Sequence, residues 1–264
     1  MLERSEPPKL DIVIGLLGPT GIGKTSVAVA LARQLKTPVI SCDSMQVYRG
    51  FPILTNQPTA AERREAAHEL IDFLDPREAF SAGEYAALAR PLIERDLSGQ
   101  GVALIAGGTG LYLRAAVAPL AKAATADPSV RRALEERALV EGDAALHAEL
   151  GRRDPAAAAA IDPRNLRRVI RALEVIEVSG RLWSGRADLW SPAYEHPTLL
   201  IALTTDREEL YRRIDERAGA IVTGGAVEEV RAHLRVSSSD ARLAPSRVGI
   251  ECAIGFGEIA SMLV

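Results

Sequence analysis

The sequence predicts an α/β fold, in which a phosphate-binding parallel sheet with helices on both faces carries an all-helical insertion domain. Short continuous apolar runs alternate with segments of helical periodicity, a pattern typical of strands that are buried on both faces of a sheet. The alternation stops from about Asp127 to Ser191, where Ala, Arg and Glu recur at helical spacing. We therefore expect a catalytic core, residues 1–125 and 193–264, interrupted by a helical domain, residues 126–192.

The predicted strands are apolar runs too short to be whole helices. They are residues 12–17 (IVIGLL), 38–42, 102–106 (VALIA) and 198–203 (TLLIAL). Amphipathic or helix-favouring segments separate them, which predicts crossover helices at 24–36, 81–98 and 109–117.

Capping signals place the remaining helices. An Asp-Pro pair offers an N-cap followed by a proline at the first helical position. Such pairs occur at Asp127-Pro128, Asp154-Pro155 and Asp162-Pro163. Thr205-Asp206-Arg207-Glu208 has the spacing of a capping box and predicts a helix to about Val222, and Thr223 predicts a shorter helix to about Val236.

Composition limits the function classes. The chain of 264 residues is 47% hydrophobic with a mean hydropathy of +0.04, it has no apolar run long enough to span a membrane, and its first ten residues lack the apolar core of a signal peptide. These features predict a cytoplasmic protein without a membrane partner.

Cys42 and Cys252 are too few for a disulfide framework or a zinc site, so we expect buried thiols. A net charge of −3 means that any contact with nucleic acid must come from local basic faces.

A phosphate-binding loop lies between the first predicted strand and the first predicted helix. It satisfies the pattern G-x-x-x-x-G-K-[ST] as Gly18, Pro19, Thr20, Gly21, Ile22, Gly23, Lys24 and Thr25. Its glycines let backbone N–H groups converge on phosphate oxygens, Lys24 adds a positive charge, and the hydroxyl of Thr25 is placed to ligate Mg²⁺. The loop predicts a diphosphate or triphosphate ligand. It does not show whether the phosphate is transferred, hydrolysed or expelled as a leaving group.

Polar residues follow two other predicted strands, at the edge where open α/β sheets bind ligands. Asp43 comes directly after residues 38–42, where a carboxylate can ligate Mg²⁺, cap a turn or act as a general base. Gly107-Gly108-Thr109-Gly110 follows residues 102–106 in the same way. Its glycines permit a close backbone approach, and Thr109 can cap the next helix or hydrogen-bond a ligand.

Basic and apolar residues separate on the segment from Arg164 to Val178. At about 100° per residue, apolar side chains fall on one side of a helix and arginines on the other. The apolar set is Leu166, Val169, Ile170, Leu173 and Ile176, and the basic set is Arg164, Arg167, Arg168 and Arg171. The acids Glu174 and Glu177 come only afterwards, so the ridge suits phosphate recognition, with a solvated surface as the alternative.

Five motifs in one order resemble the tRNA dimethylallyltransferases. They are GPTGIGKT, DSMQVY, GGTGLYL, NLRRVIRALEV and ELYRRIDERAGAIV, and the similarity runs from about Ile12 to Phe256. The resemblance implies transfer of a dimethylallyl group from dimethylallyl diphosphate to N6 of the adenosine 3′-adjacent to the anticodon of tRNA, giving N6-isopentenyladenosine.

The resemblance also implies roles for single residues. Asp43 would take the proton of the amine as general base, and Thr109 would orient the amine or the base. The phosphate loop, Lys24 and Mg²⁺ would stabilise the departing diphosphate, and Arg217 would contact it, although a solvated helix arginine is the alternative for Arg217. Ser44, Met45 and Gln46 would line the adenine pocket with Asp43 and Thr109. The tRNA contacts implied in the insertion are Arg131, Arg167, Arg168, Val169, Ile170 and Arg171.

The sequence departs from this family in two places. Residues 52–57 read PILTNQ where members usually carry a Gly and a Lys, and the sequence stops at Val264, where members continue with a Lys/Arg- and Trp-containing helix that contacts tRNA. We expect full tRNA affinity to depend on such a segment.

Two other functions fit parts of the sequence. A small-molecule P-loop kinase explains residues 12–120 equally well, but it does not explain the arginine ridge. The second is a nucleotide-dependent RNA-binding switch, which would retain the fold but would not catalyse the transfer reaction. We also expect a monomer, because the insertion shows no second apolar stripe that needs a partner.

Overall fold

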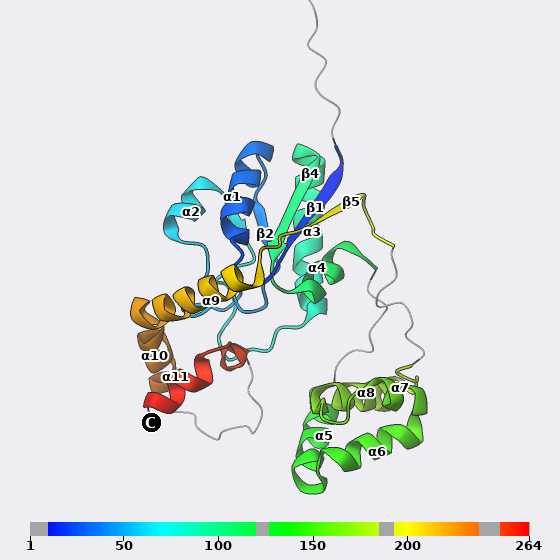
Figure 1. Ribbon diagram of the computed structural model, residues 1–264. Coiled ribbons are helices and arrows are strands. Elements are labelled where there is room, and N and C mark those ends of the chain that lie inside the picture. Colours follow the sequence, from blue (N-terminus) through cyan, green and yellow to red (C-terminus); the bar gives the residue numbers. More distant parts are fainter. Residues whose placement is uncertain (1–9, 120–126, 185–192, 238–248, 264) are drawn as a thin grey trace, which may run out of the picture. The chain divides into compact units, whose positions relative to one another are not determined.

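The computed structural model describes residues 10–119, 127–184, 193–237 and 249–263. The chain divides into two compact units, a sheet unit formed by Met1–Ala118 with Tyr194–Val264 and a helical unit formed by Pro119–Ala193 (Figure 1). The domain boundaries expected near residues 126 and 192 lie outside the described residues.

The sheet unit is built on a parallel sheet with the strand order β3-β2-β4-β1-β5 in the described part of the chain. The strands are β1 (Ile12–Leu17), β2 (Val39–Ser41), β3 (His68–Glu69), β4 (Val102–Gly107) and β5 (Thr198–Ala202). The four predicted strands are confirmed, with ends that agree to within one residue. The two-residue strand β3 was not predicted, because it is too short to show a periodicity.

Helices cover both faces of the sheet, as predicted (Figure 1). On one face α1 (Lys24–Leu35) packs Ala28, Val29 and Ala32 against Leu16 and Leu104 of the strands. On the other face α3 (Ala82–Gln100) and α4 (Gly110–Val117) pack against alternate residues of the same strands, among them Val13, Ile40, Ala103 and Ile105. Because successive strand residues point to opposite faces, both sets must be apolar, which explains the continuous runs.

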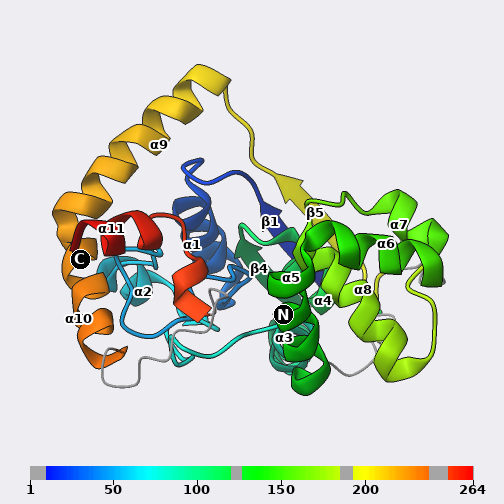
Figure 2. The same cartoon turned by 90° about the horizontal axis from the view of Figure 1, so that it is seen from below.

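A second group of helices follows β5 in the sheet unit. α9 (Arg207–Ile221) continues through a wide helical turn, Val222–Ala226, into α10 (Val227–Ser237), and α11 (Phe256–Leu263) lies beside α10 (Figure 2). Two capping predictions are wrong here. Asp206, not Thr205, precedes the first turn of α9, and Thr223 lies inside the wide turn, where its hydroxyl donates to the carbonyl oxygen of Gly219.

The other elements of the sheet unit lie in loops around this framework. The short helix α2 (Ala60–Glu65) begins with a capping box between Thr59 and Glu62 that was not predicted. Cys42 is buried as expected, whereas Cys252, the last residue of the short 3-10 turn Gly249–Cys252, is exposed.

The helical unit has its own core. It contains α5 (Pro128–Glu141), α6 (Asp143–Arg153), α7 (Pro155–Ala160) and α8 (Leu166–Ser179), which enclose Leu134, Leu146, Leu150 and Leu173. The first two Asp-Pro pairs cap helices as predicted, since Asp127 accepts from the N–H of Ser129 and Asp154 from that of Ala157. The third pair does not begin a helix. Asn165 caps α8 instead, by accepting from the N–H of Arg168.

The described helices include none that is both long enough and apolar enough to cross a lipid bilayer.

Candidate active site

The phosphate-binding loop connects the end of β1 to the start of α1. Gly21 and Gly23 have φ values of 84° and 93°, in the left-handed region that glycine adopts at little cost. A Cβ at Gly18 would lie 3.1 Å from the carbonyl oxygen of Leu203, so the loop passes close to the chain after β5. The first N–H groups of α1 have no partner within the helix, which makes this end of α1 suited to bind an anion.

Lys24 lies over its own loop in this structure. Its Nζ donates to the carbonyl oxygens of Gly18 and Pro19, each at 2.9 Å. Burial lowers the pKa of Lys24, the negative charge of Asp43 opposes this shift, and the positive charge of Arg217 adds to it. Lys24 and Asp43 line the same small cavity, although they are far apart in the sequence.

The loops that follow β2 and β4 are tied together at the carboxyl edge of the sheet. Thr109 accepts at its Oγ1 from the N–H of Ser44 at 3.0 Å, and its hydroxyl lies 3.2 Å from Ser44 Oγ. The N–H of Thr109 donates to the carbonyl oxygen of Cys42 at 3.0 Å. Thr109 is the residue before α4, but within the described residues its side chain makes no capping hydrogen bond. Its side chain therefore fixes the loop that carries Asp43.

The carboxylate of Asp43 is held in one orientation. Its Oδ1 accepts from the N–H of Met45 at 3.0 Å, and its Oδ2 lies on the side of Gly108, where an added Cβ would approach it to 3.3 Å. A Cβ at Gly107 would lie only 2.5 Å from the carbonyl oxygen of Cys42. The glycines of the second loop thus permit the close approach that the sequence pattern predicted.

Gln46 is held by a network that runs into residues 52–57. Its Oε1 accepts from Ser41 Oγ at 3.2 Å, and its Nε2 donates to the carbonyl oxygen of Asn56 at 2.8 Å. The buried Gln57 donates through Nε2 to the carbonyl oxygens of Gln46 and Tyr48, and its Oε1 accepts from Arg63 at 2.8 Å. Gln57 is thus part of the support of the site. The sequence motifs do not predict this role for Gln57, whose only sequence signal is the unusual composition of residues 52–57.

The phosphate loop and the strand-end residues share one small cavity of about 40 Å³. Its polar lining comes from Lys24, Thr25, Ser41, Asp43, Gln46 and His68. The hydroxyl, amide and carboxylate oxygens among them are the kind of ligand that Mg²⁺ prefers, so the residues present fit the expected ion. In the described residues, no three His, Cys, Asp or Glu side chains form a metal cluster, and Thr25 stays the predicted metal ligand.

Arg217 reaches this site from α9. Ile214, one turn earlier on the same face of α9, lies next to the phosphate loop, since a Cβ at Gly21 would be 3.1 Å from its Cγ1. Burial lowers the pKa of Arg217 and the charge of Asp43 opposes the shift. Arg217 is half-buried on the helix that contacts the phosphate loop, which does not fit the alternative of a freely solvated helix residue.

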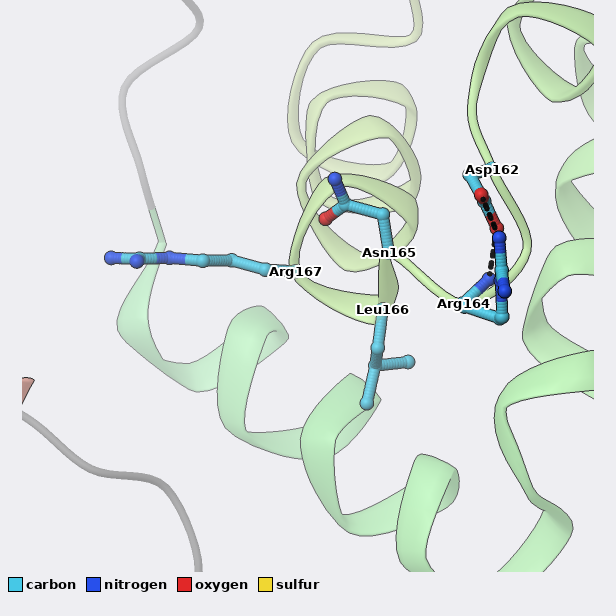
Figure 3. Close-up of a pocket in the computed structure, with 5 residues that line it drawn as sticks. All are labelled: Asp162, Arg164, Asn165, Leu166 and Arg167. Atoms are coloured by element: carbon cyan, nitrogen blue, oxygen red, sulfur yellow. Dashed lines mark hydrogen bonds and ion pairs between the residues drawn. The ribbon is translucent and has the colours of Figure 1, made fainter. Parts of the chain in front are cut away.

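The arginine ridge lies in the helical unit, on α8. Arg167 and Arg168 are exposed, while Leu173 and Ile176 are buried on the other side, as the helical periodicity predicted. Arg164 forms an ion pair with Asp162 at 2.9 Å. An open hollow of about 470 Å³ at the start of α8 is lined by Asp162, Arg164, Asn165, Leu166 and Arg167, and Arg167 extends away from the Asp162–Arg164 pair (Figure 3).

Three of the residues predicted to contact tRNA are not exposed, unpaired side chains of the ridge. Val169 and Ile170 are 0% and 3% exposed, because they belong to the core of the helical unit, so their side chains do not offer a surface to RNA. Arg171 is not a free ridge residue, since its Nη1 pairs with the buried Glu174 at 2.8 Å. Helical periodicity placed Glu174 after the ridge, but it did not show that Glu174 turns toward Arg171.

The family model of IPP transferases matches residues 46–264. The match includes Gln46, Thr109 and Arg217 of the sheet unit as well as the helical unit. The chain belongs to the IPP transferase family. A second match, to the ATPase family associated with various cellular activities, covers residues 14–75 and contains the phosphate loop of this IPP transferase family member.

Relatives of this family member carry a consistent name. A protein named tRNA dimethylallyltransferase from Anaeromyxobacter dehalogenans (strain 2CP-C) is 43% identical over 254 residues, which are 93% of this chain and 80% of the relative. A protein of the same name from Roseiflexus sp. (strain RS-1) is 44% identical over 220 residues, 83% of this chain and 71% of the relative. The resemblance inferred from the motifs is confirmed.

Solved structures agree with this assignment. The full-length tRNA isopentenylpyrophosphate transferase from Bacillus halodurans is 37% identical with a TM-score of 0.63, covering 96% of this chain and 77% of that chain. A eukaryotic dimethylallyltransferase acting on tRNA is 27% identical with a TM-score of 0.80, covering 96% and 63%. These relatives do not favour the kinase or the non-catalytic RNA-binding protein for this member of the IPP transferase family.

Proposed function

We propose that the protein transfers a dimethylallyl group from dimethylallyl diphosphate to N6 of the adenosine 3′-adjacent to the anticodon of tRNA. The observation that carries this proposal is the shared cavity, in which Lys24 and Thr25 of the phosphate loop lie beside Asp43. A diphosphate bound at the loop would present its allylic carbon next to a carboxylate. The names of the relatives support the choice of the dimethylallyl group and of tRNA as its acceptor.

Asp43 serves as the general base. The exocyclic amine of adenine is a weak nucleophile, so its proton must leave as the new bond forms. The N–H of Met45 holds Oδ1, which orients Oδ2 toward the incoming amine, and Thr109 holds the Asp43 loop through Ser44. The C–N bond forms, the C–O bond to diphosphate breaks, and the proton passes to Asp43.

The phosphate loop stabilises the departing diphosphate. Lys24 exchanges its contacts with Gly18 and Pro19 for diphosphate oxygens, and Arg217 and the first amides of α1 add positive charge. Mg²⁺, held by the hydroxyl of Thr25, would supply further charge neutralisation when bound. Partial burial strengthens these interactions, because the effective dielectric constant is lower than in water.

The test is product analysis. The protein is incubated with Mg²⁺, radiolabelled dimethylallyl diphosphate and unmodified tRNA, the tRNA is digested to nucleosides, and the label is separated by chromatography. We expect labelled N6-isopentenyladenosine. A parallel reaction with γ-labelled ATP and small hydroxyl compounds tests the kinase, and tRNA binding without a labelled nucleoside in any reaction would contradict the proposal.

The exposed arginines of α8 should carry part of the tRNA affinity. We expect Arg167→Gln with Arg168→Gln to weaken tRNA binding and to make the slope of log affinity against log salt shallower by roughly 0.7–0.9 for each lost phosphate contact. Both side chains are exposed, so the core of the helical unit is untouched. Salt titrations of tRNA binding measure both effects.

The matched control removes two other exposed arginines of the helical unit, Arg152 and Arg181, by the same change to Gln. It has the same net charge as the double variant, so a general field effect would lower affinity equally in both. Equal affinities and equal slopes in the two variants would show that Arg167 and Arg168 are ordinary solvated surface.

A further inference from the structure

His68 of β3 has one ring nitrogen that no group of the described chain satisfies. Its Nδ1 lies 2.9 Å from the carbonyl oxygen of Ala66, which can only accept, so Nδ1 carries the proton. Nε2 of the neutral ring then has a free lone pair, and this atom is buried without a hydrogen-bond partner in the described part of the chain. Burial lowers the pKa of His68, and the hydrogen bond to Ala66 opposes the shift, so the ring is neutral at pH 7.

The sheet places this ring on the side of the phosphate loop. His68 pairs in parallel register with Val39 of β2, so the two side chains point to the same face of the sheet. Val39 belongs to the apolar cluster that contains Ala28 of α1, the helix that begins at the phosphate loop. His68 therefore lies on the α1 face, where it lines the small cavity together with Thr25 and Asp43.

The cavity has room for water next to these side chains. Its volume of about 40 Å³ exceeds the roughly 10–15 Å³ that one water needs. Buried acceptors that lack a protein partner are commonly satisfied by ordered water. Mg²⁺ keeps several of its waters when it binds to a protein, and each of these waters needs acceptors for its hydrogens. A free lone pair in the cavity of Thr25, the predicted Mg²⁺ ligand, meets that need.

We infer that His68 is a positioning residue for Mg²⁺, whose Nε2 accepts a hydrogen bond from a water ligand of the ion. The inference rests on the proposed function for the ion and the diphosphate. A neutral imidazole suits this place, because it adds neither a positive charge that would repel Mg²⁺ nor a negative charge that would repel the diphosphate. By holding one water ligand, His68 would orient the ion beside Thr25, as outer-shell partners do at other metal sites.

Two uncharged substitutions separate the roles of the two ring nitrogens. Asn at position 68 keeps an N–H donor near the place of Nδ1, so it can still donate to Ala66, but it has no acceptor near the place of Nε2. Gln reaches further and offers its Oε1 near the place of Nε2, but it loses the hydrogen bond to Ala66. A structural role of His68 and the inferred role therefore predict opposite orders of the two variants.

The measurement is calorimetric titration of Mg²⁺ into protein saturated with a non-reactive dimethylallyl diphosphate analogue. We expect His68→Asn to lower the Mg²⁺ affinity by about 10–100-fold, the range for loss of an outer-shell partner, and His68→Gln to stay close to the wild type. Titration of the analogue in EDTA should give the same affinity for all of these proteins, because the phosphate loop itself is unchanged.

The matched control is His196→Asn in the same unit. Nε2 of His196 pairs with Glu94 at 2.8 Å, and His196 precedes β5, at the opposite edge of the sheet from the phosphate loop. Its Mg²⁺ affinity should equal that of the wild type. A folded His68→Asn variant with wild-type Mg²⁺ affinity would overturn the inference. So would a His68→Gln variant that loses as much affinity as His68→Asn or more, since the contact with Ala66 would then be what matters.

Circular dichroism and thermal melting show whether the variants fold. If His68→Asn does not fold, NMR of the histidine ring nitrogens in the wild-type protein provides the test. Addition of Mg²⁺ with the analogue should shift the Nε2 resonance of His68 and leave that of His196 in place, and an unshifted His68 resonance would overturn the inference. Protein that shows this Mg²⁺ effect but transfers no dimethylallyl group would contradict the proposed function while leaving the role of His68 standing.

Discussion

Asp43→Asn is expected to lower the turnover of dimethylallyl transfer by about 10²-fold or more, the range for loss of a general base. Asn keeps an oxygen that can accept from the N–H of Met45, so the loop should retain its conformation. Diphosphate binding should be as tight as in the wild type or tighter, because a negative charge beside Lys24 and Arg217 is removed. Single-turnover kinetics at saturating substrates measure the first effect, and calorimetry with a non-reactive diphosphate analogue measures the second.

The control for this variant is Asp11→Asn. Asp11 is exposed and precedes β1, at the opposite edge of the sheet from the site, and its φ of 47° is one that Asn also adopts readily. It makes the same chemical change away from the cavity, so its turnover should match the wild type. Wild-type turnover in Asp43→Asn would show that the proton of the amine leaves by another route.

Lys24→Met should cause the second large loss. The Met side chain keeps the apolar part of the lysine and removes the ammonium group that balances charge on the departing diphosphate. We expect turnover to fall by about 10²–10³-fold, the range for loss of one preorganised group that stabilises developing negative charge. The diphosphate analogue should also bind more weakly. Rapid-quench measurements of transfer and calorimetry give the two quantities separately.

The control for Lys24→Met is Arg33→Ala, which removes a positive charge from another position of α1. Arg33 pairs with Glu65 at the surface, far along α1 from the loop, and should leave both turnover and diphosphate affinity unchanged. If Lys24→Met behaved like Arg33→Ala, the phosphate loop would have no part in the displacement.

The sequence alone determined the features that depend on local pattern. The continuous apolar runs predicted β1, β2 and β4, because strands buried on both faces must be apolar at every position. The run at 198–203 predicted β5 as well, but β5 is an edge strand of the described sheet, and its Leu199 and Leu200 are exposed. The phosphate loop was evident because its glycines and Lys24 act within one short segment. The Asp-Pro pairs also correctly predicted the N-caps at Asp127 and Asp154. The pair at Asp162 was misleading, because the structure shows that Asn165 is the N-cap of α8.

Only the tertiary structure decided which distant groups meet. The link between Thr109 and Ser44, the contact of α9 with the phosphate loop, and the support of Gln46 by Gln57 all join separate segments of the chain. The ridge on α8 shows the same limit, since its periodicity separated basic from apolar residues but could not show that Glu174 holds Arg171 and Arg131. The physical reason is that periodicity reports the direction of a side chain on its own helix or strand, whereas its partner is set by the element that packs against it.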